Sequence, residues 1–133
     1  MNKEVPGHVA NRLQAALWRE ALHLVKEGVA TVEDVDTAVW AGPGLRWGAM
    51  GPHMLFNLGA GEGGMAAFCE RYAESFHRWW DDLGEPRLDA EIGATLASGL
   101  ADEAQDRSIE ELSAERDALI LAHLKAVRGL RRS

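Results

Sequence analysis

Arg46 and Trp47 are the adjacent pair in this sequence whose side chains are best suited to binding a small charged molecule. A guanidinium group can pair with a carboxylate, and the face of an indole ring can bind an organic cation. The pair lies within residues 42–51, a stretch with four glycines and Pro43 that predicts an irregular loop. Loops often carry binding residues, although Trp47 could instead plug the loop while Arg46 forms a surface salt bridge.

Asn11 is the second residue with possible chemistry, because its position in a helix is not explained by helix propensity. Pro6 and Gly7 predict a sharp turn, and an amphipathic helix begins at about His8, so Asn11 falls one turn inside it. An asparagine side chain competes with the backbone for hydrogen bonds and is a mediocre helix former. The Asn11 side chain either forms a local cap or faces solvent, or it faces whatever lies upstream of the turn.

Two other candidate motifs lack the strand or the residue spacing that their chemistry requires. Residues 59–64 match the G-x-G-x-x-G pattern of dinucleotide-binding proteins, and acidic residues follow about twenty positions later. That motif requires a preceding parallel strand, whereas here the acidic residues end the same predicted helix that the glycines begin. The histidines and Cys69 lack the spacing of metal ligands. We therefore predict neither a nucleotide site nor a metal site in this chain.

The elements that must position these residues are helices. Apolar residues recur at three- and four-residue spacing along most of the chain. Gly28 should end the first helix, Thr31 should cap the second, and Ser108 with Glu111 should form a capping box for the last. We expect an all-α fold of about six helices in a single domain, residues 1–133, with helices at about 8–27, 31–41, 52–58, 62–83, 88–100 and from 108 onward.

Composition limits the function further. The chain has 133 residues, 47% hydrophobic and 26% charged, which suits one globular domain. A net charge of −7 argues against a nucleic-acid partner, and the sequence contains no apolar run long enough to span a membrane. The single cysteine, Cys69, is expected to be a buried small hydrophobe and fits a reducing, cytoplasmic location. The tryptophans other than Trp47 are expected in the core or in a subunit contact.

Several segments resemble the C-terminal helical domain of the 3-hydroxyacyl-CoA dehydrogenase family. Residues 6–13 match a Pro-Gly-x-x-x-Asn-Arg-Leu pattern at the start of that domain, and residues 42–47 with 50–52 are similar to its glycine-rich loop and Gly-Pro pair. The arginine-aromatic loop resembles the branch of carnitine 3-dehydrogenase and lambda-crystallin (gulonate 3-dehydrogenase). Further similarity through residues 68–72 and 116–117 extends the resemblance over nearly the whole chain.

The resemblance implies a helical domain that forms one wall of a substrate cleft and most of a homodimer interface. Such enzymes oxidise a 3-hydroxyacyl-CoA or a 3-hydroxy acid, and a nucleotide-binding domain holds NAD and the catalytic histidine and glutamate. This chain alone would therefore bind no cofactor and would not catalyse. Asn11 would support catalysis by positioning the substrate or the histidine, Gly7 would let the backbone approach the substrate, and Arg46 and Trp47 would favour a small charged 3-hydroxy acid. The alternative is a stand-alone helical module for dimerisation or interaction, without enzymatic activity.

Overall fold

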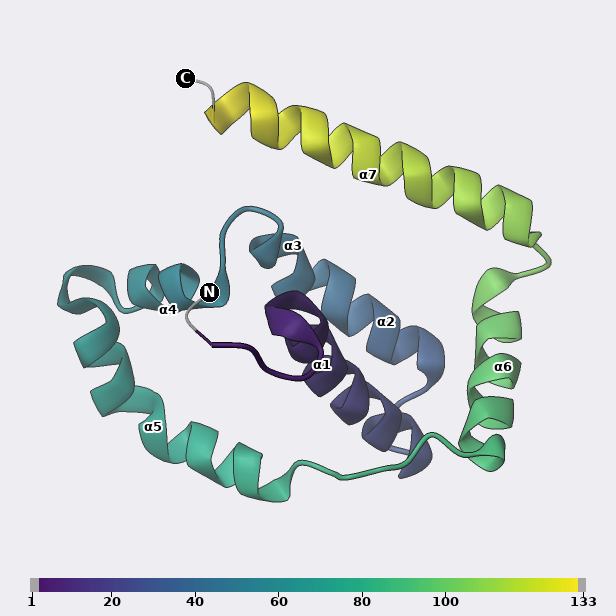
Figure 1. Ribbon diagram of the computed structural model, residues 1–133, viewed down its shortest axis with the longest axis horizontal. Helices are drawn as coiled ribbons and strands as arrows, with labels where there is room; N and C mark the ends of the chain where they lie inside the picture. The colour runs from purple at the N-terminus through teal and green to yellow at the C-terminus, as the bar shows by residue number, and fades with distance from the viewer. Residues whose placement is uncertain (1–2, 132–133) are drawn as a thin grey trace.

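The computed structural model describes residues 3–131 and, within them, contains helices but no strand (Figure 1). The predicted all-α fold class is therefore confirmed. Seven α-helices and one short 3-10 helix follow one another: α1 His8–Lys26, α2 Val32–Ala41, α3 Pro43–Trp47, α4 Pro52–Gly59, η1 Gly61–Gly63, α5 Gly64–Asp82, α6 Ala90–Ala104 and α7 Ile109–Arg131.

The predicted loop at residues 42–51 is partly wrong, because α3 occupies five of its residues. Pro43 stands at the first position of α3, where its missing N–H has no helical partner to lose and its fixed φ favours a helix. Gly44 permits the close approach of α3 to the end of α2: a Cβ added there would lie 2.6 Å from the Val39 carbonyl oxygen. The glycines that suggested a loop thus include one that allows two helices to meet.

The helix ends follow the sequence closely. Gly28 adopts a left-handed φ of 70° just after α1. Thr31 and Asp34 exchange side-chain to backbone hydrogen bonds at the start of α2, which makes a complete capping box. Ser108 and Glu111 do the same before α7, with both distances at 3.1 Å. These local hydrogen bonds satisfy amide groups that have no partner inside the helix, so they could be predicted without knowledge of the tertiary structure.

The buried core lies where α1, α2 and α6 meet. Leu22 of α1, Val32 and Val35 of α2, and Ile92 of α6 are the buried apolar residues of the described chain. A second apolar cluster joins α4 to α5, where the Phe56 and Phe68 rings stack with their centroids 4.8 Å apart. Two small clusters rather than one large core therefore hold the body of the domain together.

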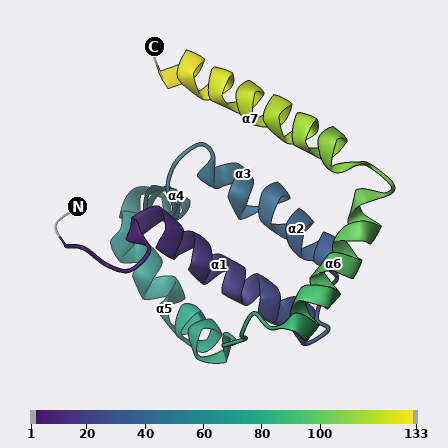
Figure 2. The same cartoon turned by 45° about the vertical axis from the view of Figure 1, so that its right-hand side comes forward.

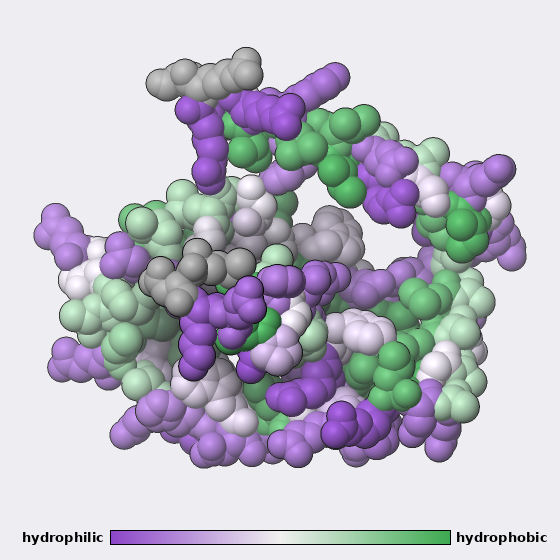
Figure 3. Space-filling model, viewed as in Figure 1, coloured by the Kyte–Doolittle hydropathy of each residue, from purple (hydrophilic) through white to green (hydrophobic). Residues whose placement is uncertain are grey.

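Helix α7 stands away from this body. Figures 1 and 2 show it crossing above α2 and α3, and Figure 3 shows an open hollow between them. Its described residues include none that is buried. The C-terminal half of α7 touches the body, where the His123 ring approaches Gly48 and the Arg131 guanidinium donates to the Ala49 carbonyl. Near the middle of this 23-residue helix, Leu119 and Ile120 remain 63% and 52% exposed.

One expectation about burial is wrong in the single chain, because Cys69 is exposed, not buried. Trp18, Trp40, Trp79 and Trp80 are 47%, 66%, 58% and 61% exposed, so they are not core residues, and a subunit contact stays a prediction for them. The total accessible surface is 10883 Å². A compact chain of 14.5 kDa exposes roughly 6,900 Å², so this one exposes about 4,000 Å² more than a self-contained domain.

Candidate functional site

The turn into α1 places Gly7 and Asn11 next to each other on the surface. Gly7 has a φ of 83°, in the left-handed region that glycine adopts most easily, and His8 follows at 53°. The His8 amide donates to the Val5 carbonyl at 3.2 Å, which closes the turn. Asn11 is exposed and its side chain makes no hydrogen bond within residues 3–131. Its amide is therefore available to a group outside this part of the chain.

Arg46 and Trp47 form the end of α3. Both side chains are exposed, and Trp47 retains 38% of its surface. The Arg46 carbonyl accepts from the amides of Ala49 and Met50 at 3.0 and 3.2 Å, so α3 ends in a tight turn. The proposed surface salt bridge of Arg46 is absent from the described residues. The guanidinium is held on a short, anchored helix and has no acidic partner among residues 3–131.

The structure does not gather the four predicted site residues into one cavity. None of them lines the main hollows of the described chain, and no hydrogen bond or ion pair there joins Asn11 to Arg46. They lie instead in two separate exposed segments, Gly7 and Asn11 at the start of α1 and Arg46 with Trp47 at the end of α3. This arrangement fits one wall of a cleft but not a complete active site.

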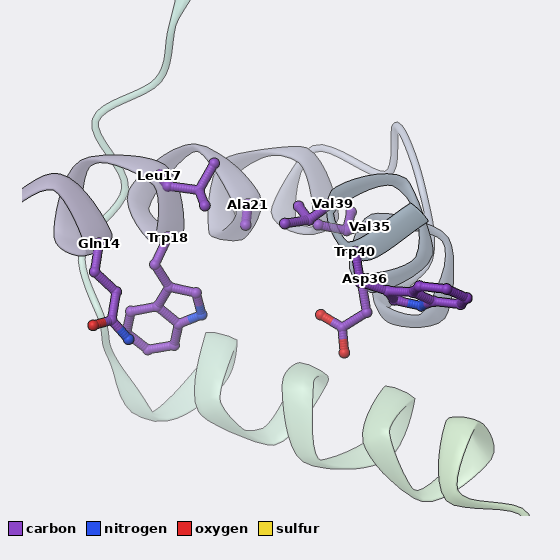
Figure 4. A pocket seen from close by; sticks show the side chains of 8 residues that line it. All are labelled: Gln14, Leu17, Trp18, Ala21, Val35, Asp36, Val39 and Trp40. Atoms are coloured by element: carbon purple, nitrogen blue, oxygen red, sulfur yellow. The ribbon is translucent and has the colours of Figure 1, made fainter. Parts of the chain in front are cut away.

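A groove that the sequence did not predict runs between α1 and α2. Its hollow of about 440 Å³ is lined by apolar side chains of both helices, with tryptophans at its two ends (Figure 4). Trp18 comes from α1 and Trp40 from α2, while Leu17 and Val39 lie between them. The only signal for this groove in the sequence was the number of tryptophans, because their exposure depends on how the two helices pack.

The groove continues beneath α7. A second hollow of about 930 Å³ shares Asp36 and Trp40 with the first and is closed on its far side by Leu119 and Ile120 of α7. Its floor near the end of α6 contains Glu103. We call the combined hollow, walled by α1 and α2 on one side and α7 on the other, the α7 groove.

The electrostatics of the α7 groove centre on Glu103. Partial burial raises its pKa to about 7, assisted by the hydrogen bond and charge of Asp36 and by the charge of Glu33, while the guanidinium of Arg107 acts in the opposite direction. Arg107 is also paired with Glu115 of α7 at 2.9 Å. Carboxylates therefore outnumber the cations around Glu103.

Metal and nucleotide sites are not indicated by the described residues. No group of three or more His, Cys, Asp or Glu side chains among them could hold a metal ion. The G-x-G-x-x-G segment connects α4 to α5 through the turn of η1, so no strand delivers it. Among the described helices, none is both long enough and apolar enough to cross a bilayer.

The sequence that contains Gly7, Asn11 and Arg46 matches a known domain family. Residues 7–108 fit the family model described as 3-hydroxyacyl-CoA dehydrogenase, C-terminal domain. The chain belongs to this family. The matched region begins at the Gly7 turn and ends before α7, so it includes every site residue predicted from the sequence.

The family's curated members include close relatives of this chain. It is 48% identical to an L-carnitine dehydrogenase of Streptomyces coelicolor over 95% of its own length and 40% of the relative's. It is 47% identical to the L-carnitine dehydrogenase of Streptomyces griseus over its full length, again 40% of the relative. The enzyme of the same name from Oceanobacillus iheyensis is 44% identical over 91% of this chain and 39% of that one. The chain thus spans about 40% of the length of the relatives it matches.

Proposed function

We propose that this chain is the substrate-binding and dimerisation domain of an NAD-dependent dehydrogenase that oxidises a small 3-hydroxy acid of the carnitine type. The observation that carries the proposal is the identity of 48% and 47% to L-carnitine dehydrogenases over 95% and 100% of this chain. The relatives are longer, so NAD, which accepts the hydride, and the base that takes the hydroxyl proton are assigned to a nucleotide-binding domain that acts with this chain.

The chemistry of the exposed turns supports a zwitterionic substrate. Carnitine carries a carboxylate and a quaternary ammonium group, and the unpaired Arg46 guanidinium suits the first while the exposed face of Trp47 suits the second. Asn11 contributes a neutral amide that can position the substrate without taking its proton, and Gly7 lets backbone approach it. We further propose a homodimer and a cytoplasmic location, the latter supported by an exposed, unpaired Cys69.

A chimera tests the proposal. This chain replaces the matched part of the Streptomyces coelicolor enzyme, and carnitine-dependent reduction of NAD is followed by absorbance. We expect activity in the chimera and none in the isolated chain. The Arg46→Ala chimera should show a KM for carnitine raised at least about tenfold, the equivalent of roughly 1.4 kcal/mol of lost binding, with a smaller change in kcat.

The controls separate this proposal from a stand-alone interaction module. Arg19→Ala removes an arginine from α1, outside both predicted turns, and should leave the KM unchanged. Asn11→Ala should lower kcat because the geometry of the reacting groups is lost. A soluble, folded chimera without carnitine oxidation would refute the dehydrogenase assignment, and an unchanged KM in Arg46→Ala would refute the role of that residue.

A further inference from the structure

We infer that helix α7 positions the proposed substrate-binding pair, Arg46 and Trp47, through two of its side chains, His123 and Arg131. The inference rests on the proposed function and deepens it, because it names further residues that set the affinity of the same site. It starts from two contacts that α7 makes with the residues directly after Trp47. We call residues 46–50 the α3 turn.

The α3 turn is stabilised by few contacts of its own. Helix α3 has only five residues and none of them is buried, and a helix of this length is not stable by itself in water. The Gly48 amide donates to the Gly44 carbonyl at 3.1 Å, and the amides of Ala49 and Met50 donate to the Arg46 carbonyl at 3.0 and 3.2 Å. All of these bonds are local, so the place of the turn in the fold depends on other elements.

The first contact is between the His123 ring and Gly48. A Cβ added at Gly48 would lie 2.7 Å from Cε1 and 3.0 Å from Nε2 of the ring, so the ring edge packs directly on the glycine. Gly48 has φ −67° and ψ −24°, a helical conformation that any residue adopts. Its missing side chain therefore serves the close approach of the ring. Because Gly48 follows Trp47, the ring supports the backbone that carries the indole.

The second contact is a hydrogen bond about two turns further along α7. The Arg131 guanidinium donates to the Ala49 carbonyl, and Figure 1 shows the chain after α3 rising toward the C-terminal half of α7. A charged donor makes a stronger hydrogen bond than a neutral one. His123 and Arg131 thus contact two consecutive residues of the α3 turn, and two attachments restrict a rotation of the turn that one would permit.

Substrate binding at this site depends on the position of the turn. A guanidinium binds a carboxylate best in a fixed planar geometry, and a binding group that is already in place loses less entropy when the ligand arrives. Arg46 has no acidic partner among residues 3–131 that could fix it instead. Helix α7 lies outside residues 7–108, which fit the family model, so its two contacts add to what that part of the chain provides.

Hydrogen exchange resolved by NMR tests the first contact in the 133-residue chain. In His123→Ala the amides of Ala49 and Met50 should exchange at least about tenfold faster, because the turn that protects them opens more often. Lys125→Ala changes an exposed residue of the same helix that has no hydrogen bond or ion pair within residues 3–131, and should leave both rates unchanged. Unchanged rates in His123→Ala, or an equal rise at the Asp34 amide in α2, would overturn the inference.

Arg131→Ala keeps the inference testable if His123→Ala fails to fold. It removes the exposed group that bonds the Ala49 carbonyl and should raise the exchange rates of the α3 turn at least about threefold. Arg128→Ala is the matched control, since this arginine of α7 is exposed and has no hydrogen bond or ion pair in the described part of the chain. Equal exchange rates in the two variants would overturn the inference.

Kinetics of the chimera distinguish positioning from a merely structural role. His123→Ala should raise the KM for carnitine at least about threefold and change kcat less than about twofold, because α7 contacts the binding turn and not the reacting groups. In a chimera that already carries Arg46→Ala and Trp47→Ala, His123→Ala should raise the KM no further, since the groups that it positions are gone. A further rise in that background would overturn the inference.

Failure of the inference can be told from failure of the proposed function. If Arg46→Ala raises the KM while His123→Ala changes neither the KM nor the exchange rates, the inference is overturned and the dehydrogenase assignment stands. A folded chimera that does not oxidise carnitine refutes the proposed function, whereas the exchange rates involve neither carnitine nor NAD and still report whether α7 supports the α3 turn.

Discussion

Alanine substitutions at two glycines of α6 should change the stability of the fold in opposite directions, and this contrast tests the packing of α6 on α2. A Cβ added at Gly99 would lie 2.7 Å from the Val32 Cβ and closer still to one of its methyl groups, whereas a Cβ added at Gly93 meets nothing within 4 Å. Both positions are helical, so an alanine gains helix propensity at each. Only Gly99→Ala must also push the two helices apart.

The magnitudes follow from these two effects. Gly93→Ala should stabilise the fold by about 0.5 to 1 kcal/mol, because alanine loses less backbone entropy on folding. Gly99→Ala gains the same amount, but overpacking a buried contact costs about 1 to 3 kcal/mol, so we expect a net loss of about 1 kcal/mol. Val32 is 7% exposed and lies in the core, so it has little room to move.

Urea unfolding followed by circular dichroism measures both variants. All proteins are compared at one concentration, because the proposed dimer would make apparent stability depend on concentration. A Val32→Ala background removes the contact with the methyl group but keeps the one with the Cβ, so Gly99→Ala should cost less stability there than in the wild type. A Gly99→Ala protein as stable as Gly93→Ala would refute the close packing of α6 on α2.

Two further predictions concern the core and the α7 groove. Ile92→Ala should destabilise the fold by about 2 to 5 kcal/mol in the same urea assay, because Ile92 is 4% exposed; a loss below about 1 kcal/mol would contradict its place in the core. Glu103, whose pKa is raised from 4.5 to about 7, makes the folded state lose stability as pH rises through that interval. The free energy of unfolding of Glu103→Gln should therefore equal that of the wild type below pH 4.5 and be larger at pH 8, by at most about 1 kcal/mol because the side chain is only partly buried. Thermal melts across this pH range that show no such difference between the two proteins would contradict the raised pKa.

Local chemistry explains which features could be predicted from the sequence. The helix periods, the caps at Thr31 and Ser108 and the stop at Gly28 depend on residues within one turn of each other. The Pro6 to Leu13 pattern and the loop with Arg46 and Trp47 likewise carry the family resemblance, which the matched family model confirms. The roles of the site residues remain predictions.

Burial was predicted less well, because it depends on partners distant in the sequence. An apolar stripe on a helix shows that one face needs cover but not which element covers it. Cys69 and the tryptophans lie on such stripes and are exposed in the single chain. The helix at Pro43–Trp47 was also missed, since its glycines permit a close contact with α2 that only the folded structure reveals.

The sequence by itself determined the helical class, the helix ends and the family, because each is recorded in short runs of residues whose spacing has a direct physical meaning. The tertiary structure alone decided that α7 stands clear of the body and that two tryptophans line the groove beside it. Helix packing is fixed by side chains from several elements at once, and these come together only when the chain has folded. The α7 groove is therefore a property of the fold that no local pattern contains.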